Sequence, residues 1–364
     1  MRRARIIGTG MAIPECVVDN DLLARCLTTS DEWITQRTGI KERRVSPDTY
    51  RMLLRLADAP DKEGFIRELY DQGLDGKIDS TLMVADLALE ASRQALKNAG
   101  LAPEDLDLIV DATTFGDYAY PGTAAVLAAK LGLTTTPTIA MNQGCAGSVY
   151  ALATADQFIR SGMYSRALVV GAELLSPFFE FSDRGRDMCV LFADGAGAAV
   201  LEAVEGADPP GLISHHLHTD GSVLDKLYGE MFGTSTFPPA SKKKIDDDRV
   251  RPRMNGRVVF VQAVRRFKEV IVECLKANGL KIDDIDLFLF HQANMRIIEA
   301  IADQLSIPLE KSFNNIAKYG NTSAASVPIC LHEAVEAGRL RRGGLVMMAA
   351  FGTGFSWGAT LMRW

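Results

Sequence analysis

An internal repeat constrains the fold of this chain more than any other feature of its sequence. Residues 95–108 read ALKNAGLAPEDLDL, and residues 274–287 read CLKANGLKIDDIDL. Each copy has a helical run that ends at a Gly-Leu pair, followed by an acidic turn and an Asp-Leu pair that opens an apolar strand. Glycine is a frequent residue just past the end of a helix, because it adopts left-handed backbone angles without strain.

The repeat continues through three further elements. A helix-like run closed by glycine spans 148–162 in the first half and 324–338 in the second. An apolar strand follows at 166–173 and at 344–351. A strand that begins with Gly-Ala then follows at 195–203 and at 358–364. Matches in the same order predict a duplicated α/β unit, with halves at residues 1–205 and 206–364. Residues 46–80 lie outside the repeat and form an insertion with two short helical patterns.

Composition narrows the class of protein. The 364 residues are 47% hydrophobic and 24% charged, which excludes wholesale disorder. A net charge of −6 argues against a nucleic-acid or anionic-membrane binder. The six cysteines form no Cys-x-x-Cys pair, and the chain has no apolar run of 18 residues. We therefore expect a cytoplasmic enzyme with no metal site and no membrane span.

Cys145 is the first candidate for chemistry. It lies in MNQGCAGSVYALATADQF, between an apolar strand and a helix, with small residues on both sides. A thiol at a helix N-terminus is favoured as the thiolate, and flanking glycines let a bound acyl group approach backbone N–H groups. The alternative is a buried structural cysteine, which is the usual role of a single cysteine.

His291 and Asn321 are the candidates in the second half. His291 follows the apolar strand LFLF, at the carboxyl end where α/β sheets bind their ligands. Asn321 precedes a helix in GNTSAAS. Alone, the histidine reads as a core residue and the asparagine as a helix cap. The repeat, however, aligns the Cys145 turn with the Asn321 turn, so the two halves are expected to bring these turns face to face.

Other motifs carry less weight. Three Gly-x-Gly strings lack the third glycine and the later acidic residue of a dinucleotide-binding fingerprint. His216 and His218 share a face of one strand, for which we favour a structural role over a metal site.

The motifs GCAG, HQAN, GNTSAAS and FGTGFSWGA together resemble the 3-oxoacyl-(acyl-carrier-protein) synthase III family, the condensing enzymes of the thiolase superfamily. DEWITQRTGIKERR (31–44) and FADGAGAAVL (192–201) match the same family, and the similarity runs from about residue 5 to 364, interrupted mainly at 46–80. The resemblance implies an α/β protein with the thiolase-type αβαβα five-layer sandwich, built from two pseudo-duplicated halves and working as a cytoplasmic homodimer.

The resemblance also implies a set of site residues. The nucleophile, histidine and asparagine fall on Cys145, His291 and Asn321, and the oxyanion hole on the backbone N–H groups of Cys145 and Thr353. Thr353 stands where the family often has the middle of three glycines. The expected coenzyme A and pantetheine contacts are Trp33, Arg37, Arg184, Gly256, Phe260, Asn294 and Arg296, and the expected acyl-pocket residues are Thr114 and Tyr120, the latter reaching toward a partner subunit.

The implied reaction is an acyl transfer by decarboxylative Claisen condensation in fatty acid biosynthesis. Cys145 takes the acyl group of an acyl-coenzyme A substrate, and a malonyl thioester, expected on acyl carrier protein, then loses carbon dioxide and attacks it. No cofactor is expected. Because carrier proteins are acidic, a basic patch of Arg265, Arg266, Lys268 and Arg296 is expected to dock the carrier.

Two other functions stay open at this point. One is a condensing enzyme of secondary metabolism that uses longer or unusual acyl groups or malonyl-coenzyme A. The other is a non-catalytic partner subunit with the same fold, which the intact Cys-His-Asn set argues against. For the insertion at 46–80, a docked surface addition is favoured over a lid at the coenzyme A entrance.

Overall fold

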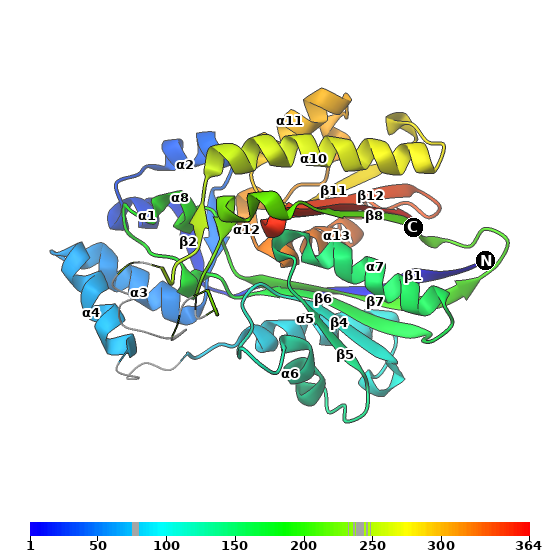
Figure 1. The fold of residues 1–364 in the computed structure, drawn as a ribbon, viewed down its shortest axis with the longest axis horizontal. Coiled ribbons are helices and arrows are strands. Elements are labelled where there is room, and N and C mark those ends of the chain that lie inside the picture. The colour runs from blue at the N-terminus through cyan, green and yellow to red at the C-terminus, as the bar shows by residue number, and fades with distance from the viewer. Residues whose placement is uncertain (75–79, 232, 236, 238–243, 245–246, 248) are drawn as a thin grey trace.

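Two β-sheets organise the chain, each formed by one half of the sequence (Figure 1). The computed structural model describes residues 1–364 except 75–79, 232, 236, 238–243, 245–246 and 248. The first sheet has the order β1-β7-β6-β4-β5, with strands Arg2–Ala12, Gly195–Glu205, Arg166–Glu173, Leu108–Ala112 and Thr138–Met141. The second has the order β11-β12-β13-β8, with strands Leu287–Phe290, Leu345–Gly352, Ser356–Arg363 and Gly211–Thr219.

The strand order repeats in the two sheets, as the sequence repeat predicts. In the first sheet β4 pairs parallel with β6, which pairs antiparallel with β7. In the second sheet β11 pairs parallel with β12, which pairs antiparallel with β13. An antiparallel strand then follows in each case, β1 beside β7 and β8 beside β13. The first sheet differs by an additional outer strand, β5, which pairs parallel with β4.

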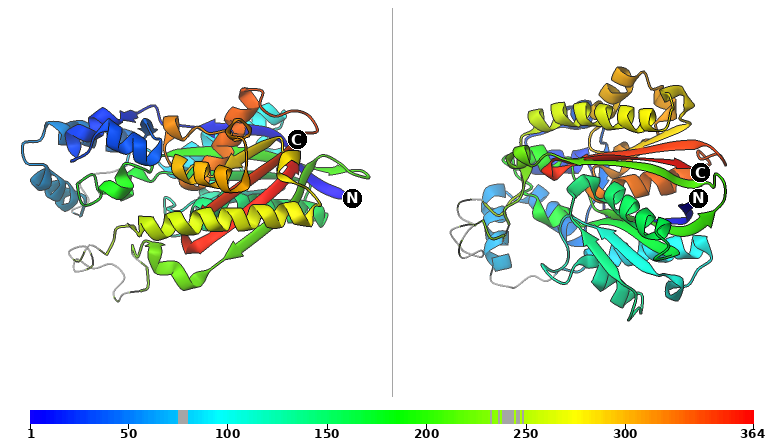
Figure 2. Two further views of the ribbon diagram at one scale, coloured as in Figure 1. Left: turned by 90° about the horizontal axis from the view of Figure 1, so that it is seen from above. Right: turned by 45° about the vertical axis from the view of Figure 1, so that its right-hand side comes forward.

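Helices cover both faces of both sheets, and five layers result (Figures 1 and 2). Helices α7 (Gly147–Arg160) and α13 (Ser326–Glu336) lie between the sheets and share one apolar core with them. Helices α5 (Val84–Ala99) and α6 (Thr123–Lys130) cover the outer face of the first sheet. Helices α10 (Gly256–Ala277) and α11 (Met295–Leu305) cover the outer face of the second. The predicted αβαβα sandwich is therefore confirmed.

The glycines that follow α5 and α10 adopt the backbone angles that the sequence predicts. Gly100 has φ 69° and Gly279 has φ 65°, both in the left-handed region. An added Cβ at either position would meet no atom within 4 Å, so conformation and not crowding explains glycine there.

A smaller apolar cluster lies beside the sandwich at the N-terminal side. It holds residues of α1 (Asn20–Cys26), α2 (Asp31–Thr38), β2 (Val17–Asp19) and α8 (Arg186–Cys189). The short strand β3 (Glu42–Arg44) pairs with β2. The insertion adds α3 (Pro47–Asp58) and α4 (Lys62–Leu74), which confirms the two predicted helical patterns; residues 75–79 of that prediction lie outside the described residues. Leu53 and Leu56 are fully buried in this cluster.

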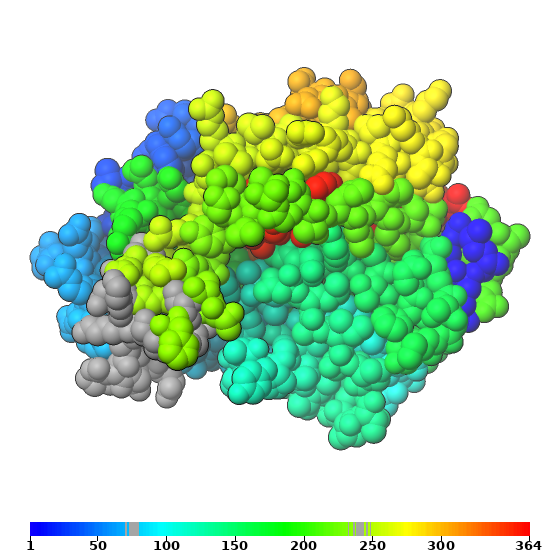
Figure 3. All heavy atoms as spheres, viewed as in Figure 1, coloured from blue at the N-terminus to red at the C-terminus, as the bar shows by residue number. Residues whose placement is uncertain are grey.

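The insertion lies apart from the long helix α10. In the space-filling view, the light blue residues of α4 form the left end of the molecule and the yellow residues of α10 form its upper edge (Figure 3). No helix within the described ranges is long and apolar enough to cross a membrane.

Candidate active site

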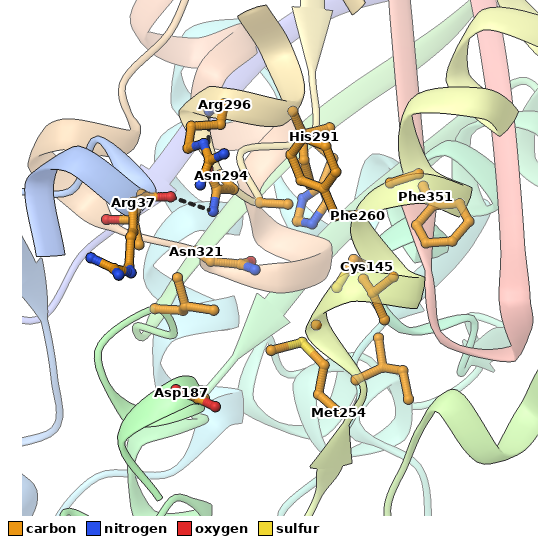
Figure 4. A pocket seen from close by; sticks show the side chains of 18 of the residues that line it. Arg37, Cys145, Asp187, Met254, Phe260, His291, Asn294, Arg296, Asn321 and Phe351 are labelled. Atoms are coloured by element: carbon orange, nitrogen blue, oxygen red, sulfur yellow. Dashed lines mark hydrogen bonds between the residues drawn. The ribbon is translucent and has the colours of Figure 1, made fainter. Parts of the chain in front are cut away.

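Cys145, His291 and Asn321 line one cavity of about 670 Å³ (Figure 4). Cys145 comes from the first half of the chain, whereas His291 and Asn321 come from the second. The Cys145 and Asn321 turns that the sequence repeat aligned thus meet at one cavity, and His291 joins them there.

Cys145 lies in the single 3₁₀ turn Gly144–Ala146 that leads directly into α7. Its side chain is buried, and burial raises the pKa of the thiol to about 12. The thiol is therefore protonated at rest. The N-terminus of the 14-residue α7 lowers the free-energy cost of forming the buried thiolate, because free backbone N–H groups there favour negative charge.

Gly352 lies against the cysteine turn. An added Cβ at Gly352 would lie 2.6 Å from the backbone nitrogen of Cys145 and 2.8 Å from that of Ala146. Only glycine allows this approach. The next residue, Thr353, donates its hydroxyl to the carbonyl of Leu227, and its methyl group faces Gly144. Thr353 stands where the family often has glycine, and these two contacts hold its side chain against Leu227 and Gly144.

His291 follows β11, and its backbone N–H donates to Ala349 O at 2.8 Å. Burial lowers the pKa of His291 to about 3, so the ring is neutral. Nδ1 lies 2.6 Å from the hydroxyl oxygen of Ser326. If that hydroxyl donates to Nδ1, the ring proton resides on Nε2. His291 then offers an N–H group as a hydrogen-bond donor.

Asn321 is attached to the first half through its backbone. Its N–H donates to Leu191 O at 2.8 Å, and its carbonyl accepts from Ala193 N at 2.9 Å. Its side-chain oxygen accepts from the N–H of Ser323 at 2.8 Å, which occupies the oxygen and leaves the amide NH₂ as the donor. His291 and Asn321 therefore both present N–H donors to the site.

Most of the predicted coenzyme A residues line the same cavity as the Cys-His-Asn set, as Figure 4 shows for four of the labelled ones. They are Trp33, Arg37, Gly256, Phe260, Asn294 and Arg296. Asn294 caps α11 by accepting from the N–H of Arg296, and its amide donates to Arg37 O at 2.9 Å. This contact joins α11 to α2.

Trp33 has cationic side chains on its ring. The guanidinium carbons of Arg37 and Arg186 lie 4.4 Å and 4.8 Å from the ring centroid. Arg186 was not singled out from the sequence, since its contact with Trp33 joins residues more than 150 positions apart. An arginine pair around an aromatic ring is well suited to phosphate and to a flat base.

Arg184 departs from its predicted place. It does not line the cavity that holds Cys145; it lines a neighbouring pocket and forms a 3.0 Å ion pair with Glu180. The turn after Ser182 sends Arg184 and Arg186 in different directions, and Arg186 is the one that reaches Trp33.

A second cavity, of about 260 Å³, also reaches Cys145. Thr114, predicted for the acyl pocket, lines it together with Thr353 and the apolar side chains Phe115, Leu175, Phe179, Met188 and Phe192. Tyr120 does not line this cavity; its side chain is 88% exposed on the surface of its own subunit. No residue of α3 or α4 lines either cavity, so the described part of the insertion is not placed as a lid.

The predicted basic patch is only partly assembled. Arg265 and Lys268 line a surface groove on α10 together with Phe260 and Val261. The inclusion of Arg266 does not fit the structure. Its guanidinium packs over Trp357 at 4.5 Å and pairs with Asp220 and Glu269, because it faces the sheet side of α10.

His216 and His218 share a face of β8, as predicted, and both contact Glu273 of α10, at 3.1 Å and 2.7 Å. Over the described residues, no group of three or more His, Cys, Asp or Glu side chains has the arrangement to hold a metal ion.

Three buried side chains near the site were missed from the sequence: Glu173 at the end of β6, Ser323, and Ser326 beside His291. Both serines belong to the GNTSAAS motif that carries Asn321, so their closeness to Asn321 in the sequence could have pointed to them. Glu173 has no local signal, since a strand-end glutamate is ordinarily solvent exposed.

Comparison with known proteins gives a consistent picture. Residues 139–221 match the family model described as 3-oxoacyl-[acyl-carrier-protein (ACP)] synthase III, and residues 275–364 match its C-terminal model. The beta-ketoacyl-[acyl-carrier-protein] synthase III of Hyphomonas neptunium is 40% identical over 366 residues, which covers 100% of this chain and 99% of that protein.

Two solved structures extend the comparison. The 3-oxoacyl-[acyl-carrier-protein] synthase III of Aquifex aeolicus is 38% identical with a TM-score of 0.82, over 99% of this chain and 100% of that one. The priming beta-ketosynthase of the R1128 polyketide biosynthetic pathway is 29% identical with a TM-score of 0.79, over 99% and 96% of the two chains.

Proposed function

Since the chain belongs to the 3-oxoacyl-[acyl-carrier-protein] synthase III family, we propose that it condenses an acyl group from acyl-coenzyme A with a malonyl thioester on acyl carrier protein. The product is a 3-oxoacyl thioester for fatty acid biosynthesis. The observation that carries this proposal is the convergence of Cys145, His291 and Asn321 on one cavity that also holds the Trp33–Arg37 contact.

Acyl loading is the first step. Acyl-coenzyme A enters the 670 Å³ cavity, with Trp33, Arg37 and Arg296 at its nucleotide end and Gly256 and Phe260 along the pantetheine. Cys145 attacks the thioester carbonyl, and the carbonyl oxygen becomes negative. The backbone N–H groups of Cys145 and Thr353 are proposed to bind it. The contact between Gly144 and Thr353 supports this pairing, because it brings both N–H groups to the same turn.

Decarboxylation is the second step, and it uses the two donors of the second half. His291 and the amide of Asn321 hydrogen-bond the malonyl thioester carbonyl. They stabilise the enolate that forms as carbon dioxide leaves. A neutral histidine suits this role because it donates a hydrogen bond without transferring a charge. The carbanion attacks the acyl group on Cys145, and the thiol is released. The reaction as proposed uses no cofactor.

The acyl chain is proposed to occupy the 260 Å³ cavity. Its walls are mainly aromatic and aliphatic, with a few polar side chains near Cys145. One methyl-sized group needs roughly 30 Å³, about the share of one water molecule. The space therefore accommodates several methylene groups beyond acetyl. This observation favours a donor longer than acetyl-coenzyme A, and it keeps a priming role outside fatty acid biosynthesis as a second candidate.

The proposed function also includes a docking patch for the carrier protein and a homodimer. Arg265, Lys268 and Arg296 form the docking patch for the acidic carrier protein. A homodimer is supported by the outer strand β5, whose backbone is available for pairing, and by the large exposed side chains of Tyr118 and Tyr120. The cytoplasm is its proposed location. A non-catalytic subunit is disfavoured, because a scaffold has no use for a cysteine, a histidine and an asparagine that converge on one cavity.

Intact-protein mass spectrometry tests the proposal. The protein is incubated with an equimolar mixture of acetyl-, butyryl-, hexanoyl- and octanoyl-coenzyme A, and the mass that it retains identifies the donor. A single acyl adduct in the wild type and none in Cys145→Ala is the expected result. Adducts that persist in Cys145→Ala would contradict the assignment of the nucleophile, and absence of any adduct would contradict the proposed function.

A further inference from the structure

A buried carboxyl group lies next to the nucleophile and has no role in the mechanism above. Glu173 is the last residue of β6 and is fully buried. Its Oε1 accepts from Thr114 Oγ1 at 2.7 Å and from Ala324 N at 3.2 Å, and its Oε2 accepts from Thr114 N at 3.0 Å. Every hydrogen bond that stabilises this carboxylate comes from the turns around Cys145.

Two hydroxyl groups beside this carboxylate line the same cavity as the sulfur. Ser323 Oγ lies 3.4 Å from Thr114 Oγ1, which in turn donates to Glu173. Burial raises the pKa of both the Cys145 thiol and the Glu173 carboxyl, and the Ser323 side chain offsets part of that rise. Cys145, Ser323 and Thr114 all line the 260 Å³ cavity.

The backbone of Ser323 offers a second, independent observation. Ser323 has φ +48°, in the left-handed region that residues with a side chain rarely adopt. The corresponding residue of the first half is Gly144, with φ +50° at the start of the equivalent turn. One half uses glycine for this conformation, while the other keeps a buried serine at an energetic cost. Retained strain of this kind is characteristic of functional residues.

We propose that Glu173 accepts the proton of Cys145 through the hydroxyls of Ser323 and Thr114 when the enzyme is acylated. This inference rests on the proposed function. Glu173 does not touch the substrate; it acts through the two hydroxyls as a positioning residue for the proton.

The step balances over the catalytic cycle. In acylation the Cys145 sulfur bonds to the acyl carbon, and the bond between that carbon and the sulfur of coenzyme A breaks. The thiol proton passes to Ser323, the Ser323 proton to Thr114, and the Thr114 proton to Glu173. Coenzyme A leaves as a thiolate and takes a proton from water at the open cavity. In condensation the carbanion displaces Cys145, and the relay returns its proton to the sulfur.

The surroundings favour Glu173 over His291 as the acceptor. Burial raises the pKa of Glu173 to about 7, whereas the pKa of His291 lies at about 3, so the carboxylate holds a proton more firmly than the ring. The titratable groups facing Glu173 are Cys145 and, on β4, Asp111. Burial and the nearby Glu173 raise the pKa of Asp111 well above its ordinary value.

Three variants and one matched control test the relay. Glu173→Gln removes the acceptor, Ser323→Gly removes one hydroxyl at a backbone conformation that glycine prefers, and Thr114→Val removes the other. Thr114→Ser keeps that hydroxyl and serves as the control. For each protein, the rate of single-turnover acylation of Cys145 by acyl-coenzyme A is measured between pH 5.5 and 9, and decarboxylation of malonyl thioester is measured on the same preparation.

In the wild type, acylation should rise with pH and level off once Glu173 has ionised. In the three variants it should fall tenfold or more at pH 7 and continue to rise up to pH 9, because only the free thiolate then reacts. Decarboxylation should fall much less than acylation, and Thr114→Ser should keep more of the acylation rate than Thr114→Val.

Two results would overturn the relay. One is wild-type acylation, with an unchanged pH profile, in Glu173→Gln and in Thr114→Val. The other is an equal loss of acylation and decarboxylation in every variant, Thr114→Ser included, which would indicate a structural role alone. A wild-type protein that forms no acyl-enzyme would overturn the proposed function together with the relay. In the two results above, by contrast, the wild type still forms the acyl-enzyme.

Discussion

The two halves of the molecule share one topology but differ at the turns that face each other. In the first half the turn Gly144–Ala146 carries the nucleophile at the start of α7. In the second half the turn Ser323–Ala325 carries a serine hydroxyl in place of Gly144 and an alanine in place of Cys145. The helix N-termini lie close together, since an added Cβ at Gly147 would lie 3.5 Å from that of Ala324.

This difference shows how a repeated fold divides its chemistry. The first half supplies the group that forms a covalent bond, and the second half supplies hydrogen-bond donors, His291 and Asn321. Because Cys145 and the two donors serve different steps, substitution of Cys145 and substitution of a donor should impair different steps of the reaction.

The largest expected effect is a separation of the two steps by half. Cys145→Ala should abolish acyl loading and leave malonyl decarboxylation measurable, since the donors are untouched. His291→Ala and Asn321→Ala should still load the acyl group and lose decarboxylation by roughly 10²–10³-fold. Carbon dioxide release and acyl-enzyme mass measure the two steps separately. Condensation at the wild-type rate in either donor variant would contradict the division between the halves.

The second prediction concerns opposite pH responses of the halves. Burial raises the pKa of Glu173 from 4.5 to about 7, so the folded state loses stability as the pH rises through that interval. The shift corresponds to roughly 3 kcal/mol. Burial lowers the pKa of His291 from 6.5 to about 3, so the stability contribution of the neutral ring is lost as the pH falls below 6.5.

Urea unfolding between pH 4.5 and 8 measures both responses. Relative to Glu173→Gln, the wild type should lose free energy of unfolding as the pH rises from 4.5 to 8. Relative to His291→Gln, it should lose free energy of unfolding as the pH falls below 6.5. If both differences in unfolding free energy, wild type minus variant, changed in the same direction with pH, burial would not act oppositely on the two groups.

The third prediction compares the equivalent turn positions. Gly144→Ala puts a side chain at φ +50° and a Cβ 2.4 Å from the Thr353 methyl carbon, so unfolding free energy should fall by about 1–3 kcal/mol. Ser323→Gly relieves the same backbone strain and should change stability by less than about 1 kcal/mol. Equal losses in the two variants would refute the view that Ser323 is kept for its hydroxyl.

The smallest expected effect concerns carrier docking, which only the second half provides. Arg265→Glu combined with Lys268→Glu should raise the KM for malonyl-carrier substrate severalfold at low salt, and acyl-coenzyme A loading should be unaffected. Arg341→Glu, an exposed arginine at the far end of β12, serves as the control. An unchanged KM would remove the docking role and would favour malonyl-coenzyme A as the extender.

Much of this site was predictable from the sequence. Cys145 and His291 each follow a strand and precede a helix, a pattern that local periodicity records, and the repeat aligned the Cys145 turn with the Asn321 turn. Trp33, Arg37, Phe260 and Arg296 came from motifs that resemble a known family. Arg184 and Arg266 were misplaced, because a motif specifies that an arginine is present but not which way its side chain turns.

The sequence by itself determined the duplicated α/β units, the helix ends at Gly100 and Gly279, and the turns that hold the reactive groups. These features depend on local periodicity and on backbone angles, which a few neighbouring residues control. Tertiary structure alone decided that Arg186 stacks on Trp33, that Arg266 packs on Trp357, and that Glu173 meets Thr114 and the turn around Ser323. Contacts of this kind join residues about 60 to 150 positions apart, so they exist only once distant segments have packed and the buried polar groups have found partners.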